Sequence, residues 1–222
     1  MRSPLITTVC AFLLMGLLAT DVHAQTRKKG KTDFALLIPY LYGERIEFEG
    51  GAAADIESDP GIGFGFAYYF SEQLAGRFDL VWNSTGFSAE RVLDDGSGTV
   101  EVVGGRLDAF NLVFGGDYYL TRSKVAPFVN ANLGWTFVNT DIPSGAPIPG
   151  CWWDPWWGYV CGSVRPTHGD TSFFYGAGLG LRADLSRNLF GRLGYYQTWL
   201  DLDHARGTPT LNTTRFEFGV LY

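Results

Sequence analysis

The segment Phe216-Glu-Phe-Gly-Val-Leu-Tyr222 decides the fold, because apolar residues at positions 216, 218, 220 and 222 alternate with other residues. Alternation with a period of two is typical of a β-strand with one apolar face. A sequence that stops within a strand leaves an unpaired sheet edge unless another strand closes it. The segment therefore favours a closed barrel, in which the last strand pairs with the first.

The amino-terminal segment has the pattern of an export signal. Arg2 precedes an apolar run at 9–19, and Val22-His-Ala24 supplies the small residues of a cleavage site. We expect residues 1–24 to be a signal peptide and residues 25–32 to be a basic periplasmic leader. The run is too short for a membrane-spanning helix, and no later run reaches about 18 apolar residues. Any membrane span must then be built from strands.

Charge and composition narrow the class of protein. Five of the 17 basic residues and one of the 23 acidic residues precede position 33, which leaves 12 basic against 22 acidic residues in 33–222. Nucleic-acid binding needs a basic face, so we expect no nucleic-acid partner. The 29 Gly and the 16% aromatic residues fit strands whose two faces meet different solvents.

Eight segments repeat the period of two, with the apolar residues of each on one face. Each is about ten residues long, the length that a tilted strand needs to cross a bilayer. They lie at 34–42, 62–70, 74–82, 110–118, 125–137, 173–181, 189–199 and 216–222. The count is even, as closure requires. We predict an all-β fold, an eight-stranded antiparallel up-and-down transmembrane β-barrel over residues 33–222.

The connections between these segments alternate in length. Short polar turns are expected at 71–73, 121–124 and 186–188. Longer connections are expected at 44–59, 86–104, 139–170 and 201–211. Short turns on the periplasmic rim and long loops outside are typical of bacterial outer-membrane barrels. The pattern predicts a location in the outer membrane of a Gram-negative bacterium, with both termini periplasmic.

Residues out of phase with the apolar face should point into the barrel. Four basic and four acidic side chains share this phase: Arg77, Asp79, Asp117, Arg182, Asp184, Arg192, Arg215 and Glu217. Glycines of the same phase leave room for these side chains to pair: Gly61, Gly63, Gly65, Gly176, Gly178, Gly180 and Gly194. Buried charges persist only when paired, so we expect an ion-pair core that plugs the lumen. The alternative is a proton or ion relay.

Two cysteines follow the signal segment, Cys151 and Cys161, and an even pair in an exported chain predicts a disulfide. Zinc binding is the weaker alternative, because further His or Cys ligands are missing nearby. The enclosed aromatic residues are Trp152, Trp153, Trp156, Trp157 and Tyr159. They form either a binding surface for glycan, lipid or protein, or a small core packed on neighbouring loops. If the ring lies low, it extends an outer aromatic girdle.

Other polar residues give weaker signals. Residues 44–59 carry six acids and one base, which fit a solvated surface or, alternatively, divalent cations shared with lipopolysaccharide phosphates. After the signal segment the sequence contains only His168 and His204, and neither has the neighbouring Ser that a lipid deacylase needs. We therefore expect no catalytic residue, no cofactor and no metal ligand.

With these features, the chain resembles the small eight-stranded outer-membrane β-barrel family of the OmpA, OmpX and opacity-protein type. The resemblance rests on the signal segment, the eight alternating segments and the last seven residues. It implies that the outer-membrane assembly machinery reads this last segment, through Phe216, Phe218, Gly219, Val220 and Tyr222. Barrels of this type serve as anchors, adhesins, small channels and lipid-modifying enzymes, so the fold alone does not fix the function.

The sequence thus predicts a monomeric, non-enzymatic surface or envelope protein with a plugged lumen. Its partners would be outer-membrane lipid, lipopolysaccharide and a host or matrix ligand of the outer loops. A narrow porin-like channel for small solutes is the alternative, since one-sided lumen charge would open the barrel whereas pairing closes it. A lipid-modifying enzyme is a more distant alternative.

Overall fold

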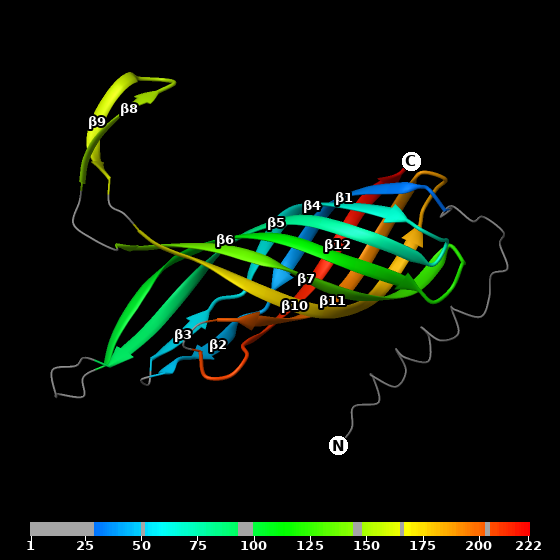
Figure 1. Cartoon of the computed structure of the whole chain (residues 1–222), viewed down its shortest axis with the longest axis horizontal. Helices are drawn as coiled ribbons and strands as arrows, with labels where there is room; N and C mark the ends of the chain where they lie inside the picture. Colours follow the sequence, from blue (N-terminus) through cyan, green and yellow to red (C-terminus); the bar gives the residue numbers. More distant parts are fainter. Residues whose placement is uncertain (1–28, 50–51, 93–99, 144–147, 165–166, 203–204) are drawn as a thin grey trace.

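The computed structural model describes residues 29–49, 52–92, 100–143, 148–164, 167–202 and 205–222, where the chain forms a barrel and a separate two-stranded ribbon (Figure 1). The expected signal peptide and residues 25–28 of the expected leader lie outside these residues. The barrel strands are β1 (Thr32–Leu41), β4 (Asp59–Tyr69), β5 (Leu74–Val92), β6 (Val100–Tyr119), β7 (Val125–Pro143), β10 (Thr167–Asp184), β11 (Leu189–Asp201) and β12 (Thr210–Leu221). The remaining strands are β2 (Glu44–Glu47), β3 (Ala53–Ile56), β8 (Ile148–Asp154) and β9 (Gly158–Val164).

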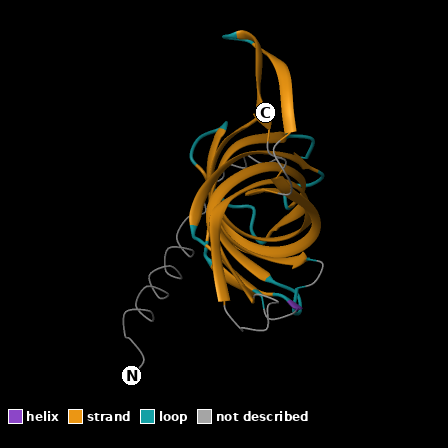
Figure 2. Ribbon diagram, turned by 90° about the vertical axis from the view of Figure 1, so that its left-hand side faces the viewer, coloured by secondary structure: helices purple, strands orange, loops and turns teal. Residues whose placement is uncertain are grey.

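The eight barrel strands form a closed antiparallel ring, which Figure 2 shows from one end. Around the ring the order is β1, β4, β5, β6, β7, β10, β11 and β12, and β12 returns to pair with β1. Phe34 lies opposite Val220 and Leu36 opposite Phe218 in this closing pair. The predicted fold class is confirmed, and the last strand of the sequence pairs with the first.

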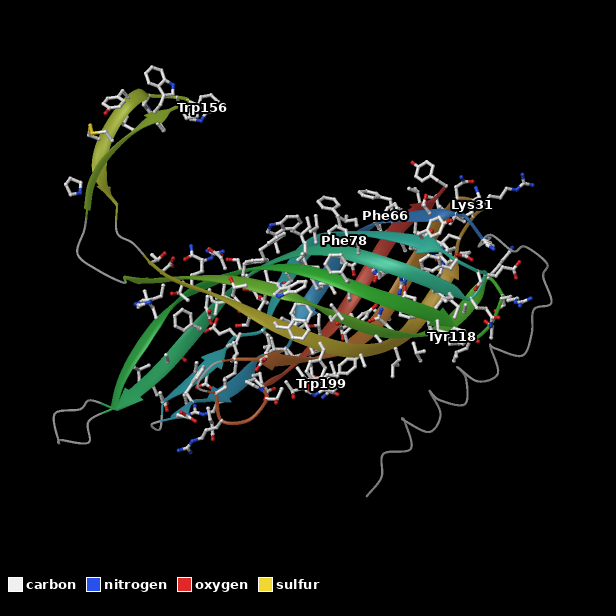
Figure 3. All side chains as sticks on the ribbon, in the orientation of Figure 1. Lys31, Phe66, Phe78, Tyr118, Trp156 and Trp199 are labelled. Atoms are coloured by element: carbon white, nitrogen blue, oxygen red, sulfur yellow. A yellow bond between two sulfur atoms is a disulfide. The ribbon has the colours of Figure 1, made fainter. Side chains whose placement is uncertain are left out.

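Side chains alternate between the two faces of the wall, as the sequence pattern requires. On β1 the outward Phe34 is 50% exposed, whereas the inward Leu37 is fully buried. Phe66 and Tyr118, labelled in Figure 3, are both 47% exposed on the outer face. The outer face is thus apolar around the barrel, which suits contact with lipid acyl chains. No helix in the described residues is long and apolar enough to cross a membrane.

The two ends of the barrel differ in their connections. At one end, here called the turn end, residues 70–73, 120–124 and 185–188 join neighbouring strands. The start of β1 and the last residue of the sequence meet there, because Thr32 N donates to Tyr222 O over 3.1 Å and Tyr222 N donates to Thr32 O over 2.8 Å. The opposite end, here called the loop end, carries the four longer connections. The alternation of short and long connections therefore appears in the structure.

Two of the expected loops are much shorter than the sequence indicated. Strands β5 and β6 pair without interruption from Leu74 opposite Tyr118 to Val92 opposite Val100, so most of 86–104 is strand. Strands β7 and β10 extend into the two ends of 139–170, at 139–143 and 167–170, and β8 and β9 occupy most of the segment between them. The sequence pattern ended each strand where the outward apolar residues end. Beyond the lipid the outer face needs no apolar residues, although the backbone ladder continues.

The expected loop 44–59 contains the hairpin β2–β3. Strand β3 pairs with β5 from Ala53 opposite Glu90 to Ile56 opposite Phe87, beyond the end of β4. On its other side the hairpin reaches the β11–β12 connection, where Phe48 forms a bridge with Ala205. The hairpin therefore continues the barrel wall at the loop end, where β1 and β4 have already stopped.

Candidate functional site

The lumen near the turn end is filled by a network of charged side chains, here called the plug. Arg77 Nε donates to Asp79 Oδ1 over 2.7 Å, and Arg77 Nη2 donates to Glu217 Oε2 over 2.8 Å. Arg215 bonds the same two carboxylates, with Nη1 2.9 Å from Asp79 Oδ2 and Nε 2.9 Å from Glu217 Oε1. Each of these carboxylates is thus shared by two arginines from different strands.

A second group of the plug lies closer to the turns. Arg182 Nε donates to Asp184 Oδ1 over 2.6 Å, and Arg182 Nη1 bonds both Asp33 Oδ2 and the Tyr69 hydroxyl. Tyr69 in turn donates to Asp33 Oδ2 over 2.7 Å. These groups are nearly or completely buried. A buried charge is tolerated when it is paired and hydrogen-bonded in this way.

Arg192 is the plug residue with the poorest hydrogen bonding. Its Nη1 lies 2.9 Å from Asp117 Oδ2 in an ion pair, and its Nε lies 3.6 Å from Glu217 Oε2. None of its nitrogens has a well-aligned hydrogen bond to a described residue. The guanidinium instead lies over the Phe128 ring at 4.1 Å from the centroid. Arg192 is therefore held by charge and ring stacking, so its position depends on the carboxylates around it.

Aromatic rings and glycines shape the space around the arginines. The Arg182 guanidinium lies 3.8 Å from the centroid of Phe190, and that of Arg215 lies 4.1 Å from the centroid of Tyr196. Each ring lies against a glycine. A Cβ on Gly219 would come within 2.6 Å of Phe190 Cζ, and one on Gly178 within 2.8 Å of Tyr196 Cε1. The glycines make room for the rings, and the rings cover the guanidinium planes.

The structure brings all eight predicted lumen charges into this plug, together with residues that the sequence reasoning missed. Asp33 is a fifth carboxylate, so the expected balance of four against four is wrong: four arginines face five acids. Asp33 has the same phase on β1 as the inward Ala35 and Leu37, and this alternation could have identified it as a lumen residue. The inward side chains also include large buried rings, which the sequence analysis did not place in the lumen. The rings are Tyr69, Tyr119, Phe128, Phe190 and Tyr196.

Towards the loop end the same lumen is hollow. A cavity of about 350 Å³ lies there, lined mainly by apolar residues of seven barrel strands and of the hairpin β2–β3. Arg215 and Tyr196 belong both to the plug and to the lining of this cavity. The plug thus forms the floor of the cavity.

The ribbon β8–β9, here called the aromatic ribbon, stands away from the barrel in Figure 1. Cys151 and Cys161 lie directly opposite each other in it and form the predicted disulfide. Its rings are exposed to solvent: Trp153 by 75%, Trp156 by 84% and Trp157 by 78%. Tyr159 is 68% exposed, and the side chain of Trp152 lies outside the described set. These four rings are therefore mostly open to solvent.

The acidic loop and His168 form no metal centre in the described part of the chain. Arg45 on β2 pairs with Asp55 at 2.6 Å and with Glu90 at 2.8 Å. The hydrogen bond to Glu90 and the charges of both acids raise the pKa of Arg45. His168 is exposed, and Thr140 donates to its backbone oxygen; His204 lies outside the described residues. Among the described residues no group of three or more His, Cys, Asp or Glu is placed to hold a metal ion.

Comparisons with known proteins agree with this architecture. The family model described as outer membrane protein beta-barrel domain matches residues 10–222. The crystal structure of Neisserial surface protein A is similar, with 12% identity, a TM-score of 0.50 and coverage of 87% of this chain and 98% of that one. The outer membrane protein OprG from Pseudomonas aeruginosa gives 13% identity, a TM-score of 0.51 and coverage of 89% and 98%. No curated protein matches in sequence.

Proposed function

The chain belongs to the outer membrane protein beta-barrel domain family, and on that basis we propose a non-enzymatic surface protein of the outer membrane. Its lumen is plugged, and its outer loops contact lipopolysaccharide, host or matrix molecules. The observation that carries the proposal is the plug, whose paired charges occupy the lumen near the turn end. A filled lumen leaves the surface beyond the loop end as the part that can meet a partner.

The plug also argues against the narrow-channel alternative. Solute channels keep a continuous polar path, often with rings of one charge sign. In this barrel the charges of opposite sign satisfy one another, and Tyr119 and Phe128 are completely or almost completely buried beside them. Opening a path would require breaking several buried ion pairs at once, which is costly.

The aromatic ribbon supports a role in surface contact. Residues 148–164 contain one acid, Asp154, and no Lys, Arg or His. A nearly neutral surface of exposed Trp and Tyr rings suits the apolar faces of sugars or the interfacial zone of a lipid layer better than a phosphate group. The disulfide holds the two strands in register, which lowers the ordering cost of binding. We therefore place the contact with sugars of lipopolysaccharide, host or matrix at these rings.

The proposal requires the loop end to face outward and both termini to face the periplasm. A cysteine at Thr208, in a background with Cys151→Ser and Cys161→Ser, should react with a membrane-impermeant thiol reagent on intact cells. A cysteine at Ser123, in a short turn, should react only after the outer membrane is opened. The reverse pattern would exclude the proposed orientation, and with it the exposure of the ribbon.

The contact itself is tested by replacing Trp153, Trp156 and Trp157 with Ser. Binding of intact cells to immobilised lipopolysaccharide, host glycans and matrix proteins should fall at least about tenfold for the ligand that is recognised. The matched control is Val102→Ser, which changes an exposed apolar residue on β6 away from the ribbon. Heat-modifiable mobility on gels verifies that each barrel is folded. Equal binding by the triple variant and the parent would refute the ribbon as the contact surface.

A further inference from the structure

The hollow part of the lumen has the size and lining of a small-molecule site. Its volume of about 350 Å³ falls in the range of ligand pockets. Apolar side chains from opposite sides of the barrel dominate the lining; they include Leu41, Val81, Phe87, Leu107, Val138 and Leu200. Arg215 and Asp170 are the charged residues of the lining. A mainly apolar molecule with one polar end is the class of ligand that such a lining suits.

The cavity is closed at its base and along its side. The plug lies beneath it, and Arg215 belongs both to the plug and to the cavity lining. The hairpin β2–β3 supplies Ile46, Ala54 and Ile56 to the wall where β1 and β4 have ended. The ion pairs of Arg45 with Asp55 and Glu90 fasten this hairpin to itself and to β5. The cavity is therefore a cup at the loop end and not a passage through the barrel.

Polar groups with unused hydrogen-bonding capacity line the cup. Arg215 uses Nε and Nη1 for Glu217 and Asp79, and Nη2 takes part in neither bond. The amide of Asn83 lies over Gly61, where a Cβ would clash with it, and bonds no described residue. Asn111 also lines the cavity without a hydrogen bond to the described residues. Polar groups of this kind orient a ligand within an apolar pocket.

Asn83 and Asn111 lie on neighbouring strands. Asn83 is opposite Ala109 and Asn111 is opposite Val81, which makes the two amides diagonal neighbours on the inner face of β5 and β6. Each amide offers two N–H donors, and the guanidinium edge offers more. An oxygen acceptor on the ligand satisfies these donors, whereas a trimethylammonium head offers them no acceptor.

From these observations we propose that the cup binds a single-chain amphiphile with an oxygen-acceptor head, of which a medium-chain fatty acid is the simplest example. The carboxylate accepts hydrogen bonds from the neighbouring amides of Asn83 and Asn111, and the alkyl chain lies against the apolar wall. This site is separate from the aromatic ribbon. It does not depend on what the ribbon contacts.

The test uses the purified barrel in phosphatidylcholine nanodiscs, with radiolabelled decanoate as the probe. After subtraction of the signal from empty nanodiscs, the parent should bind decanoate saturably at one molecule per barrel. The double variant Asn83→Leu/Asn111→Leu should bind at least about tenfold more weakly, on the scale of one or two lost hydrogen bonds. Its fold should be unchanged, because neither amide bonds a described residue. Decyltrimethylammonium should not compete.

A second variant separates binding in the cup from partition into lipid. Ala109→Trp fills the cavity from β6, so it should abolish saturable binding. Val102→Ser, outside the cavity, should bind as the parent does. No saturable binding by the folded parent would overturn the proposal, and so would equal affinity for Ala109→Trp and the parent. Unchanged affinity in the double Asn variant would overturn the assignment of the head group.

Discussion

The two halves of the lumen obey the same alternation of side chains yet end in opposite states. Towards the turns, arginines, acids and rings fill the space so completely that Arg182, Asp117 and Tyr119 are fully buried. Towards the loops, inward positions such as Val81, Asn83 and Thr85 leave a cavity of about 350 Å³. Barrel closure decides which residues face inward, whereas their size and charge decide whether that part of the lumen is solid or hollow.

The energetic logic of the two halves differs as well. Every arginine of the plug is removed from water, and the loss of hydration is unfavourable. Only several carboxylate and ring partners together offset this desolvation free energy. Asp117 illustrates this, because it takes a hydrogen bond of 2.7 Å from Asn130 and an ion pair of 2.9 Å from Arg192. In the cup, polar groups face open space and need no such network. Mutations should therefore affect stability in the first half and binding in the second.

The largest effect is expected from deletion of 216–222, which removes closure of the plug half alone. Residues 33–38 of β1 and residues 189–193 of β11 would both lose their pairing partners on β12. The pairs that β12 makes nearer the loop end, at 210–215, would remain. Two exposed edges at the turn end should prevent insertion and lead to degradation or aggregation in the periplasm. Fractionation and heat-modifiable mobility measure this. A folded truncated barrel in the outer membrane would show that closure at the plug is dispensable.

The second largest effect is expected for Arg192→Ala, which should lower the free energy of unfolding much more than Arg45→Ala does. Arg192 is buried, and its loss leaves Asp117 with Asn130 and an Arg77 guanidinium 3.8 Å away. We expect a loss of about 3–5 kcal/mol in the free energy of unfolding. Arg45 makes exposed ion pairs, which solvent screens, so its replacement should lower the free energy of unfolding far less than that of Arg192. Urea unfolding of the refolded barrels gives both values.

The contrast between these two variants is the informative result. Equal unfolding midpoints for Arg192→Ala and the parent would mean that the plug charges do not support the barrel. A loss in Arg45→Ala as large as that in Arg192→Ala would mean that the exposed wall at the loop end is as critical as the buried network.

The smallest effect concerns added volume. A Cβ on Gly180 would lie 2.7 Å from Phe128 Cζ and would also clash with the Leu193 backbone oxygen. Gly180→Val should therefore cost about 1–3 kcal/mol by overpacking. Ala109 lines the cup, where there is room, so Ala109→Val should change stability by less than about 1 kcal/mol. Similar losses for the two variants in urea unfolding would contradict the division into a solid and a hollow half.

The sequence predicted the parts of this fold that depend on alternation. The outward face, the number of strands in the ring, their order and the Cys151–Cys161 disulfide all follow from residue pattern and spacing. Asp33 also had the correct phase, but it precedes the first apolar residue of β1 and was not counted. Strand ends and the hairpin β2–β3 could not be predicted in the same way, because the wall beyond the lipid carries no apolar outer face.

The division of the lumen into a filled and a hollow half depends on which residues of neighbouring strands lie opposite each other. The alternation along a single strand does not provide this register. Gly180 lies opposite Phe128 across β10 and β7, so that the ring occupies the space that the glycine leaves. Such a pair connects residues 52 positions apart and becomes evident only once the strands are aligned. The sequence reasoning treated the lumen as uniform and placed charges and glycines in it throughout. It therefore predicted the plug residues but not the rings around them, and not the cup above them.

Single-channel conductance tests most directly whether the plug closes the barrel. Purified, refolded protein would be inserted into planar bilayers, with a known porin as the positive control for the recording. The arrangement of Arg77, Arg192 and Arg215 with their carboxylates predicts no steady conductance across a range of voltages. A steady, ohmic conductance from the folded parent would contradict the plugged lumen and support a channel instead.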